Sequence, residues 1–290
     1  MKNTRVAVDV GGTFTDVVIM DESTGAIRIE KTSSTPDDPM VAILNGIDQG
    51  GIDLSKVSMF SHGTTVATNA LLERKGDPLA LVITGGLRDQ LRLAYQARPR
   101  IFDRELIRPE MLYSEVMEAR ERVRADGAIE APLDAAHLRD ALVPVFESGI
   151  KSVAIVFCHG YRYREHEAEA AAIARDIGFT QVSVSHEVSP LMKMVSRGDT
   201  TVVDAYLTPI LRRYIDRVAA AFDGDMSGKL MFMQSSGGLT DALNFQGKDA
   251  ILSGPAGGVV GCIGTSKIAG KDNVIGFDMG GTSSDVCHYA

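Results

Sequence analysis

The 290-residue sequence has no tryptophan, only three cysteines and no apolar run as long as a transmembrane helix needs. The missing tryptophan carries no functional information, whereas the missing apolar run argues against a helical membrane span. The cysteines are odd in number, scattered and without the spacing of zinc ligands, at Cys158, Cys262 and Cys287. Residues 1–5 lead straight into an expected strand, so no signal peptide is predicted. We expect reduced thiols and a cytoplasmic location.

Positive charge is also scarce. The chain has 30 Lys and Arg against 38 Asp and Glu, a formal net charge of −8, and an isoelectric point near 5.3. This balance argues against binding to nucleic acid, whose phosphates attract basic surfaces. Residues 92–108 do alternate arginines with Tyr95 and Phe102, but the acidic background favours a loop or an interface there. Apolar content of 44% is typical of a globular protein with one large or two modest domains.

The most informative feature is a loop motif that occurs twice. Residues 8–17 read VDVGGTFTDV and residues 277–286 read FDMGGTSSDV. Each copy follows a short apolar run, so each predicts a tight hairpin between two strands. Glycines permit positive φ and let backbone N–H groups approach an anion closely. One copy could equally be an ordinary glycine-rich hairpin. Two copies predict a duplicated fold with a nucleotide bound between its halves.

Within these loops we predict the residues that bind phosphate and magnesium. Asp9 and Asp278 stand at strand ends, where two carboxylates could hold Mg²⁺ through its water shell and act as the catalytic pair; otherwise each only caps a turn. Backbone N–H groups and hydroxyls would bind the phosphates, and the residues that supply them are Gly11, Gly12, Thr13, Thr15, Gly280, Gly281, Thr282 and Ser283. Asp16 and Asp285 are expected to hold the hairpins through local hydrogen bonds, although one could orient the attacking group.

The paired loops resemble those of the actin, sugar-kinase and heat-shock-chaperone superfamily, in which ATP lies between two lobes. Further motifs identify the chain as a member of the hydantoinase A/5-oxoprolinase family, which includes subunits of acetone and acetophenone carboxylases. They are GTTVATNALLERKG at 63–76, TGGLRD at 84–89, RPE at 108–110, QSSGGL at 234–239 and SGPAGGVVG at 253–261. These motifs extend over nearly the whole chain.

The resemblance implies an α/β, actin-like (ribonuclease H-like) ATPase fold, with the first lobe and the start of the second. Residues 1–190 would form the hydantoinase/oxoprolinase N-terminal region, with a β/α subdomain inserted from about 115 to 190. Residues 191–290 would begin the hydantoinase A domain and an incomplete second lobe. We therefore expect a fragment of a longer protein, or a lobe completed by another polypeptide. The implied cofactors are ATP and Mg²⁺, and the implied partner in a hetero-oligomer is a hydantoinase B-like subunit.

The resemblance also implies a reaction. In this family ATP phosphorylates a carbonyl or enol oxygen, either for hydrolysis of a cyclic amide (hydantoin or 5-oxoproline) or for carboxylation of a ketone. The sequence does not separate these two substrate classes. A nucleotide-binding regulatory module and a small-molecule kinase remain as alternatives. The signature at 63–76 favours the enzyme over the module, and no clear catalytic Asp base supports the kinase.

Four further residues are candidates for substrate binding. His62 is expected at the carboxyl end of a strand, where α/β sites gather, and a structural histidine is the equal alternative. The other candidates, in a polar strip with Thr68 at the start of a helix, are Thr64, Thr65 and Asn69. The pairs at 158–159 and 166–167 lack the further ligands that a metal site needs. Arg197 and Asp199 are expected just before a long helix, paired with each other or with a substrate carboxylate.

Local signals also predict several elements. Strands are expected at 5–9, 15–20, 26–32, 57–61 and 79–84, and the segment at 36–39 should begin a helix that runs to about Gly50. A second helix, from residue 64, should end at Gly76, and the stretch 199–222 should form two helical pieces around Pro209. The glycine-rich helix at 255–268 is predicted to cross another helix closely, because so many glycines destabilise an isolated helix.

Overall fold

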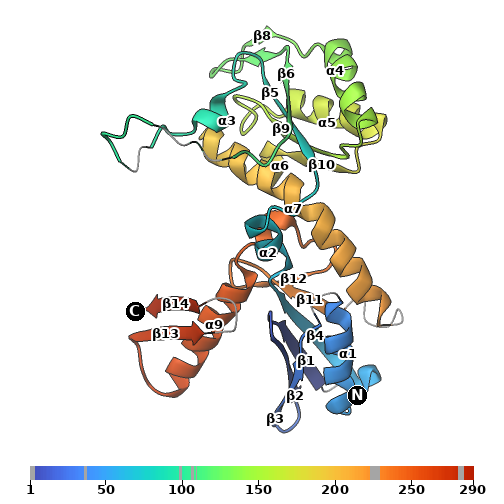
Figure 1. The fold of residues 1–290 in the computed structure, drawn as a ribbon, viewed down its shortest axis with the longest axis vertical. Helices are drawn as coiled ribbons and strands as arrows, with labels where there is room; N and C mark the ends of the chain where they lie inside the picture. Colours follow the sequence, from blue (N-terminus) through green and yellow to red (C-terminus); the bar gives the residue numbers. More distant parts are fainter. Residues whose placement is uncertain are drawn as a thin grey trace. The chain divides into compact units, whose positions relative to one another are not determined.

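The computed structural model describes residues 4–35, 38–97, 100–105, 108, 110–222, 229–279 and 284–290. These form two compact units (Figure 1). Unit 1 consists of Met1–Glu73 and Leu211–Ala290, and unit 2 of Arg74–Ile210. In the sequence, unit 2 is thus an insertion into unit 1. The expected division into domains after residue 190 stays a prediction, since the compact units divide at other positions.

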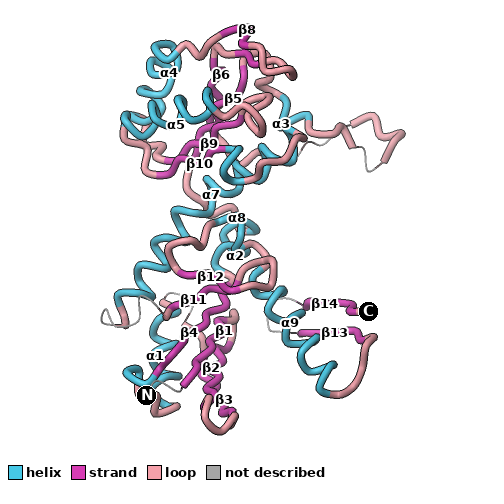
Figure 2. The backbone as a smooth tube through the Cα atoms, turned by 180° about the vertical axis from the view of Figure 1, so that it is seen from behind, coloured by secondary structure: helices cyan, strands magenta, loops and turns pink. Residues whose placement is uncertain are grey.

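Unit 1 is built on a six-stranded sheet of order β12-β11-β4-β1-β2-β3. β1 to β3 form an antiparallel meander, which Figure 2 shows as neighbouring strands, and β4 and β11 add to it in parallel. Their bounds are Thr4–Val10, Phe14–Asp21, Ile27–Ser33, Val57–Thr64 and Leu230–Met233, with β12 at Leu239–Asp241. Alternate residues of β1 are buried, so the sheet turns one apolar face to the core.

Helix α1 (Pro39–Gln49) covers part of this sheet and begins as predicted. The Asp38 carboxylate accepts from the Met40 N–H at 3.2 Å, and Pro39 occupies the first turn. Such a cap satisfies a backbone donor that the first turn leaves free. Close approach to β2 requires Gly46, because a Cβ there would lie 2.5 Å from Cγ2 of Val17. The helix is therefore fixed both by its cap and by its contact with the sheet.

Besides the last turns of a long helix described below, unit 1 contains short helices, one longer helix and a hairpin. They are η1 (Leu54–Lys56), α2 (Val66–Leu72), α8 (Gly247–Ala250), α9 (Ser253–Ile268), β13 (Val274–Met279) and β14 (Ser284–Tyr289). Helix α9 contacts β4 and β11 of the main sheet and also both strands of the hairpin. It therefore connects the two regions of unit 1 that carry the repeated motif.

Unit 2 contains a four-stranded parallel sheet of order β10-β9-β5-β6. The bounds are β5 Leu79–Thr84, β6 Glu115–Ala119, β9 Ser152–Val156 and β10 Gln181–Val184. Every residue of β5 and β9 is buried, as expected of central strands in a parallel sheet. Helices α4 (Ala135–Glu147) and α5 (Glu165–Ile177) lie side by side on one side of it (Figure 1).

Local turn chemistry in unit 2 follows the sequence. Asp134 caps α4 by accepting from the His137 N–H at 3.0 Å, and Gly178 ends α5 with φ 115°. The short strands β7 (Arg122–Val123) and β8 (Ile129–Ala131) form a hairpin around Gly127, whose φ is 92°. The remaining short helices are α3 (Gln90–Leu93) and α6 (Ser185–Val188).

Two helix predictions were wrong. Helix α7 is one continuous helix, Met194–Ala220, with Pro209 inside it. Proline removes one backbone donor, but the side chains on both sides of it, among them Leu207 and Leu211, are buried, and this burial favours a continuous helix. Helix α2 ends at Leu72 rather than near Gly76, and Arg74 takes the positive φ of 55° that follows.

Gly76 has a different role, because a Cβ there would lie 2.1 Å from Cε1 of Tyr206. This glycine therefore allows close packing within unit 2 instead of ending a helix.

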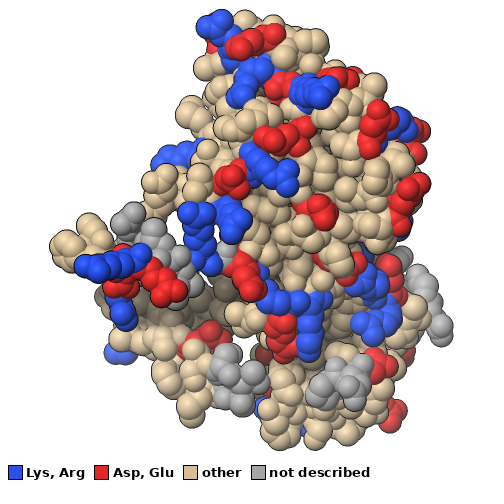
Figure 3. Space-filling view, turned by 45° about the horizontal axis from the view of Figure 1, so that its top comes forward, with Lys and Arg blue, Asp and Glu red and all other residues tan. Residues whose placement is uncertain are grey.

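No helix in the described part of the chain is both long and apolar enough to cross a membrane. On the face shown in Figure 3, Lys and Arg side chains are mixed with Asp and Glu, and no continuous basic patch is visible.

Candidate functional site

The two copies of the motif form hairpins with the same register. Asp9 stands opposite Asp16 across β1 and β2, and Asp278 stands opposite Asp285 across β13 and β14. The hairpin prediction is therefore confirmed for both copies, and Asp9 and Asp278 occupy equivalent positions. The turn of the second copy, with Gly280, Gly281, Thr282 and Ser283, lies outside the described residues.

The first turn is closed by backbone contacts. The Gly11 N–H donates to the Phe14 carbonyl at 3.1 Å, and the Ser34 hydroxyl donates to the Gly11 carbonyl at 2.7 Å. A Cβ at Gly11 would lie only 2.9 Å from the same Phe14 oxygen, so this position requires glycine. Gly12 and Thr13 are exposed at the tip of the turn, where their N–H groups could meet an anion.

Thr15, predicted to bind phosphate, has a different environment. Its side chain is 0% exposed, and its hydroxyl lies 3.0 Å from that of Ser34. In this structure the hydroxyl thus ties β2 to the segment after β3. The predicted contact with phosphate would need this side chain to leave its present partner.

The carboxylate of Asp9 has a raised pKa. Burial is the main cause, and the negative charges of Asp16 and Asp278 add to it, while Lys31 opposes the shift. The Lys31 ammonium is committed to Asp16, 2.9 Å from its Oδ1. Asp9 and Asp278 are therefore within electrostatic reach of each other, and their charges repel. A divalent cation between them would relieve this repulsion, so the donor set fits Mg²⁺.

Glycines leave space beside both carboxylates. A Cβ at Gly63 of β4 would lie 3.3 Å from Oδ1 of Asp9, and a Cβ at Gly258 of α9 would lie 3.9 Å from Oδ2 of Asp278. Across the described ranges, no three His, Cys, Asp or Glu side chains converge on one point as direct metal ligands. Binding of the ion through its water shell stays a prediction.

The polar strip at the start of α2 divides into two parts. The Thr64 carbonyl accepts from the Ser253 hydroxyl at 2.7 Å, and the Thr68 hydroxyl donates to the Ile251 carbonyl at 2.5 Å. These contacts hold α2 against the start of α9. Thr65 and Asn69 contact each other at 3.3 Å, and Asn69 is exposed. Their predicted contact with substrate stays a prediction.

His62 lies in the core of unit 1. Its side chain is 1% exposed, its Nε2 is 2.5 Å from the Tyr214 hydroxyl, and the Phe232 ring meets it edge-on. Burial lowers the pKa of His62 to about 3, so the imidazole is neutral near neutral pH. Nδ1 has no hydrogen-bond partner among the described residues. Of the two alternatives for His62, the structural histidine fits this position better.

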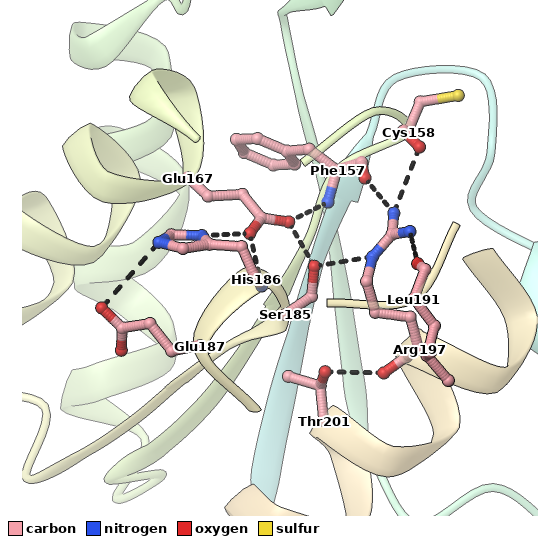
Figure 4. A network of polar contacts seen from close by, with 9 residues as sticks. All are labelled: Phe157, Cys158, Glu167, Ser185, His186, Glu187, Leu191, Arg197 and Thr201. Atoms are coloured by element: carbon pink, nitrogen blue, oxygen red, sulfur yellow. Dashed lines mark hydrogen bonds and ion pairs between the residues drawn. The ribbon is translucent and has the colours of Figure 1, made fainter. Parts of the chain in front are cut away.

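Unit 2 contains a buried polar network that the sequence did not reveal (Figure 4). The Glu167 carboxylate accepts from the Phe157 N–H at 2.8 Å, the Ser185 hydroxyl at 2.5 Å and Nδ1 of His186 at 2.7 Å. The neighbouring His166 instead meets Glu121, at 2.9 Å. The adjacent residues 166 and 167 thus have different hydrogen-bond partners.

The pairing of Arg197 with Asp199 was wrong. Arg197 lies inside α7 rather than before it and is 0% exposed. Its guanidinium donates to one hydroxyl and four carbonyls at 2.6 to 3.1 Å, those of Ser185, Leu191, Met192, Phe157 and Cys158. Burial lowers the pKa of Arg197, an effect that the nearby Glu167 charge opposes. Arg197 therefore holds the ends of β9 and β10 to α7 and is not available to a substrate.

A polar pocket of about 520 Å³ in unit 2 was also missed. Its lining includes Arg88, Arg92, Arg108 and Tyr113. The sequence signals were the arginine-rich stretch from residue 92 to 108, which was interpreted as a loop or an interface, and the motifs at 84–89 and 108–110, which were used only to identify the family.

The α/β fold and the two equivalent Asp-Gly-Gly-Thr hairpins define the class of protein. The chain belongs to the hydantoinase/oxoprolinase family: residues 5–178 match the family's N-terminal region, described as "Hydantoinase/oxoprolinase N-terminal region", and residues 197–290 match "Hydantoinase/oxoprolinase". The family resemblance drawn from the motifs is thereby confirmed.

Known proteins resemble the chain over almost its whole length. It is 36% identical over 340 residues to the 5-oxoprolinase of Dictyostelium discoideum, covering 99% of this chain and 27% of that protein. It is 35% identical over 298 residues to caprolactamase subunit alpha of Pseudomonas jessenii, covering 97% of this chain and 43% of the relative. The chain thus spans less than half the length of each of these relatives.

Two solved structures share the fold. The ATP-dependent caprolactamase from Pseudomonas jessenii superposes with a TM-score of 0.85 at 33% identity, over 98% of this chain and 43% of the other. The nucleotide-free structure of an acetone carboxylase superposes with a TM-score of 0.83 at 24% identity, over 100% of this chain and 44% of the other. At that identity the second likeness concerns the fold alone.

Proposed function

We propose that this chain is the phosphate-binding part of an ATP-dependent enzyme subunit that activates a carbonyl oxygen by phosphorylation, for hydrolysis of a cyclic amide. The observation that carries the proposal is the arrangement of Asp9 and Asp278 at equivalent positions of two hairpins, within electrostatic reach of each other. The proposed fold is actin-like, with one phosphate loop in each hairpin.

A cyclic amide resists hydrolysis because resonance makes its carbonyl carbon a poor electrophile. When bound, ATP would supply the phosphoryl group that turns the carbonyl oxygen into part of a leaving group, and Mg²⁺ would offset the charge on the phosphates. The chain's own residues would position these groups. Asp9 and Asp278 would accept hydrogen bonds from the water shell of the ion, and the exposed turn at Gly12 and Thr13 would offer N–H donors to phosphate oxygens.

The turn at residues 280–283 would take the equivalent role in the second hairpin, because its motif and register match those of the first. The proposed contacts to substrate are made by Thr65 and Asn69 at the surface of α2. His62 and Thr64 are buried and would act by holding this region in place.

The whole protein's partner and location are also proposals. A relative named as subunit alpha supports an enzyme of several subunits, and we propose a hydantoinase B-like partner in a cytoplasmic hetero-oligomer. Cyclic-amide hydrolysis is preferred over ketone carboxylation, because the oxoprolinase and the caprolactamase exceed 30% identity whereas the acetone carboxylase does not.

The test is substrate-dependent release of phosphate from ATP by the full-length protein with its partner subunit. We expect release to be stimulated by 5-oxoproline or another cyclic amide, and not by acetone with bicarbonate. Stimulation by acetone alone would replace cyclic-amide hydrolysis with ketone carboxylation. No stimulation by either would refute substrate activation.

A further inference from the structure

Two of the three cysteines meet beside the second hairpin. Cys262 lies on α9, and Cys287 lies on β14 directly opposite Gly276 of β13. A Cβ added at Gly276 would lie 2.5 Å from Sγ of Cys287 and 2.9 Å from Sγ of Cys262. The two sulfur atoms therefore share the space over one glycine, although they come from different elements.

The two thiols also interact with each other. Partial burial, and then a hydrogen bond with Cys287, raise the pKa of the Cys262 thiol. Both cysteines are free thiols, and both are partly exposed. Helix α9 contacts both strands of the hairpin and lies beside it in Figure 1. The fold thus brings two oxidisable sulfurs together on elements that already pack against each other, which is the first requirement of a disulfide.

The same face of α9 lies beside Asp278. A Cβ added at Gly258 would lie 3.9 Å from Oδ2 of Asp278, and Cys262 follows Gly258 by one helical turn. A covalent bond from Cys262 to Cys287 would therefore fix β14 to α9 one turn away from this carboxylate. The sequence gave no sign of this pair, because the cysteines are scattered along the chain.

We propose that Cys262 and Cys287 form a modification site, a dithiol that hydrogen peroxide oxidises to an intramolecular disulfide. The Cys287 thiolate attacks one peroxide oxygen and the O–O bond breaks, which gives a sulfenic acid and a hydroxide that takes up the thiol proton as water. The Cys262 sulfur then attacks the Cys287 sulfur, and the sulfenic hydroxide leaves as water with the Cys262 proton. Two electrons leave the sulfurs, and peroxide is reduced to two molecules of water.

The order of attack follows from the pair itself. Cys262 retains its proton more firmly than an ordinary thiol, so Cys287 is the attacking sulfur and Cys262 the resolving one. Where glutathione keeps thiols reduced, the pair is a dithiol at rest and oxidises transiently. The inference does not depend on the proposed reaction, and it adds a reversible cross-link to the hairpin that carries Asp278.

The experiment uses the full-length protein, which is reduced, freed of reductant, exposed to hydrogen peroxide and then treated with an alkylating agent. Trypsin cuts after Lys267 and Lys271, which separates the two cysteines, and mass spectrometry without reduction identifies peptides that stay joined. We expect the Cys262 and Cys287 peptides as one species, lighter by two hydrogen atoms than their sum. Dithiothreitol should release them as two peptides that can be alkylated.

Three variants test the assignment. Cys262→Ser leaves the sulfenic acid of Cys287 without its partner, so this sulfur should advance to sulfinic acid, which dithiothreitol does not reverse. Cys287→Ser should leave Cys262 free for alkylation after the same treatment. Cys158→Ser is the matched control, because Cys158 is a partly exposed cysteine of unit 2, and the cross-link should form in it as in the wild type.

Hydrogen exchange measures the effect of the cross-link on the hairpin. Amides of β13 and β14 should exchange at least about tenfold more slowly in the oxidised protein, because the bond to α9 restricts local opening. Dithiothreitol should restore the original rates. In Cys262→Ser, peroxide should leave these rates unchanged.

Three results would overturn the proposed site: both cysteines stay open to alkylation at a peroxide concentration that oxidises free glutathione, a cross-link joins Cys158 to one of them instead, or Cys287 resists sulfinic acid formation in Cys262→Ser as it does in the wild type. Unchanged exchange of β13 and β14 in the cross-linked protein would refute the fixing of the hairpin to α9.

Discussion

Asp9 and Asp278 come from opposite ends of the chain, yet the charge of Asp278 helps to raise the pKa of Asp9, after burial and the charge of Asp16. Both residues stand at the same register position of their hairpins, each opposite a second aspartate. Four carboxylates thus belong to one pair of turns. Lys31 pairs with Asp16, and the repulsion between Asp9 and Asp278 is the feature on which the proposed function depends.

The first prediction concerns catalysis. Asp9→Asn or Asp278→Asn in the complete enzyme should lower ATP hydrolysis by at least about 100-fold, because each removes a charge that would hold the proposed metal ion. Phosphate release measures the effect. Asp48→Asn, an exposed position on α1, is the control and should keep full activity. Near-normal turnover in both site variants would refute the two-loop site.

The second prediction concerns stability and pH. The pKa of Asp9 in the folded protein lies above its usual 3.8, so ionising this group opposes folding. The penalty is present above the folded pKa and disappears as the pH falls below the unfolded value. Asp9→Asn should therefore be more stable than the wild type near pH 7, and the difference should shrink towards about pH 3.5.

Denaturant unfolding of both proteins across this range provides the measurement. A variant less stable than the wild type at neutral pH would show that Asp9 is stabilised in its charged form.

The third prediction concerns His62. Burial lowers the pKa of His62 in the folded protein to about 3. As the pH falls, this histidine therefore takes up a proton in the unfolded chain at a higher pH than in the folded protein. The stabilising effect of the neutral form is therefore lost as pH falls from about 6.5. His62→Phe should show a smaller loss of stability between about pH 7 and pH 5 than the wild type does. The control is His137→Phe, because His137 lies on α4 and is partly exposed. Equal pH slopes in the wild type and His62→Phe would contradict the buried, neutral assignment.

The fourth prediction concerns the buried guanidinium of Arg197. Arg197→Met should lower the free energy of unfolding by about 3–5 kcal/mol, because it leaves several buried acceptors and the Glu167 charge without their donor. Arg139→Met, at a half-exposed ion pair with Asp176, should cost no more than about 1 kcal/mol. Urea denaturation compares the two. A similar small cost for both would mean that Arg197 is solvated in solution.

The fifth prediction concerns the glycine-rich helix α9. The glycine-rich helix was expected to face another helix closely, but in the described residues a Cβ at Gly261 would meet no atom within 4 Å. Gly261→Ala should therefore stabilise this chain by about 0.5–1 kcal/mol through helix propensity. By contrast, a Cβ at Gly276 would lie 2.5 Å from Sγ of Cys287, so Gly276→Ala should destabilise.

Thermal melts of the two variants distinguish these effects. Destabilisation by Gly261→Ala would indicate that another segment covers this face of α9.

Local signals were predictable from the sequence because their chemistry is local. Asp38 and Asp134 cap helices, Gly178 ends one, and the repeated Gly-Gly turn forms hairpins at both sites, all through contacts within a few residues. The predicted break at Pro209 was wrong because burial of side chains along α7 outweighs the missing backbone donor. This burial depends on contacts with distant segments, which the local sequence does not show.

Long-range contacts account for the rest. The arginine pocket joins Arg88 to Arg108 and Tyr113 through the fold of unit 2, and Arg197 donates to carbonyls just after β9 and in the segment before α7. No periodic pattern in the sequence indicates these long-range contacts. His62 was located correctly at the end of a strand, but its burial depends on Tyr214 and Phe232, both far away in the sequence.

The insertion of unit 2 into unit 1 has a consequence for the order of folding. During synthesis the ribosome releases all of Arg74–Ile210 before β11, so unit 2 can fold while the unit 1 sheet still lacks its last strands. The pairing of β4 with β11, in which Phe60 stands opposite Leu230, can form only after unit 2 has been synthesised. Once unit 2 is folded, the flexible part of the chain between these two strands is shorter, so the entropy cost of closing this loop is smaller. A variant that slows folding of unit 2 should therefore delay completion of the sheet that carries Asp9, without touching any residue of that sheet.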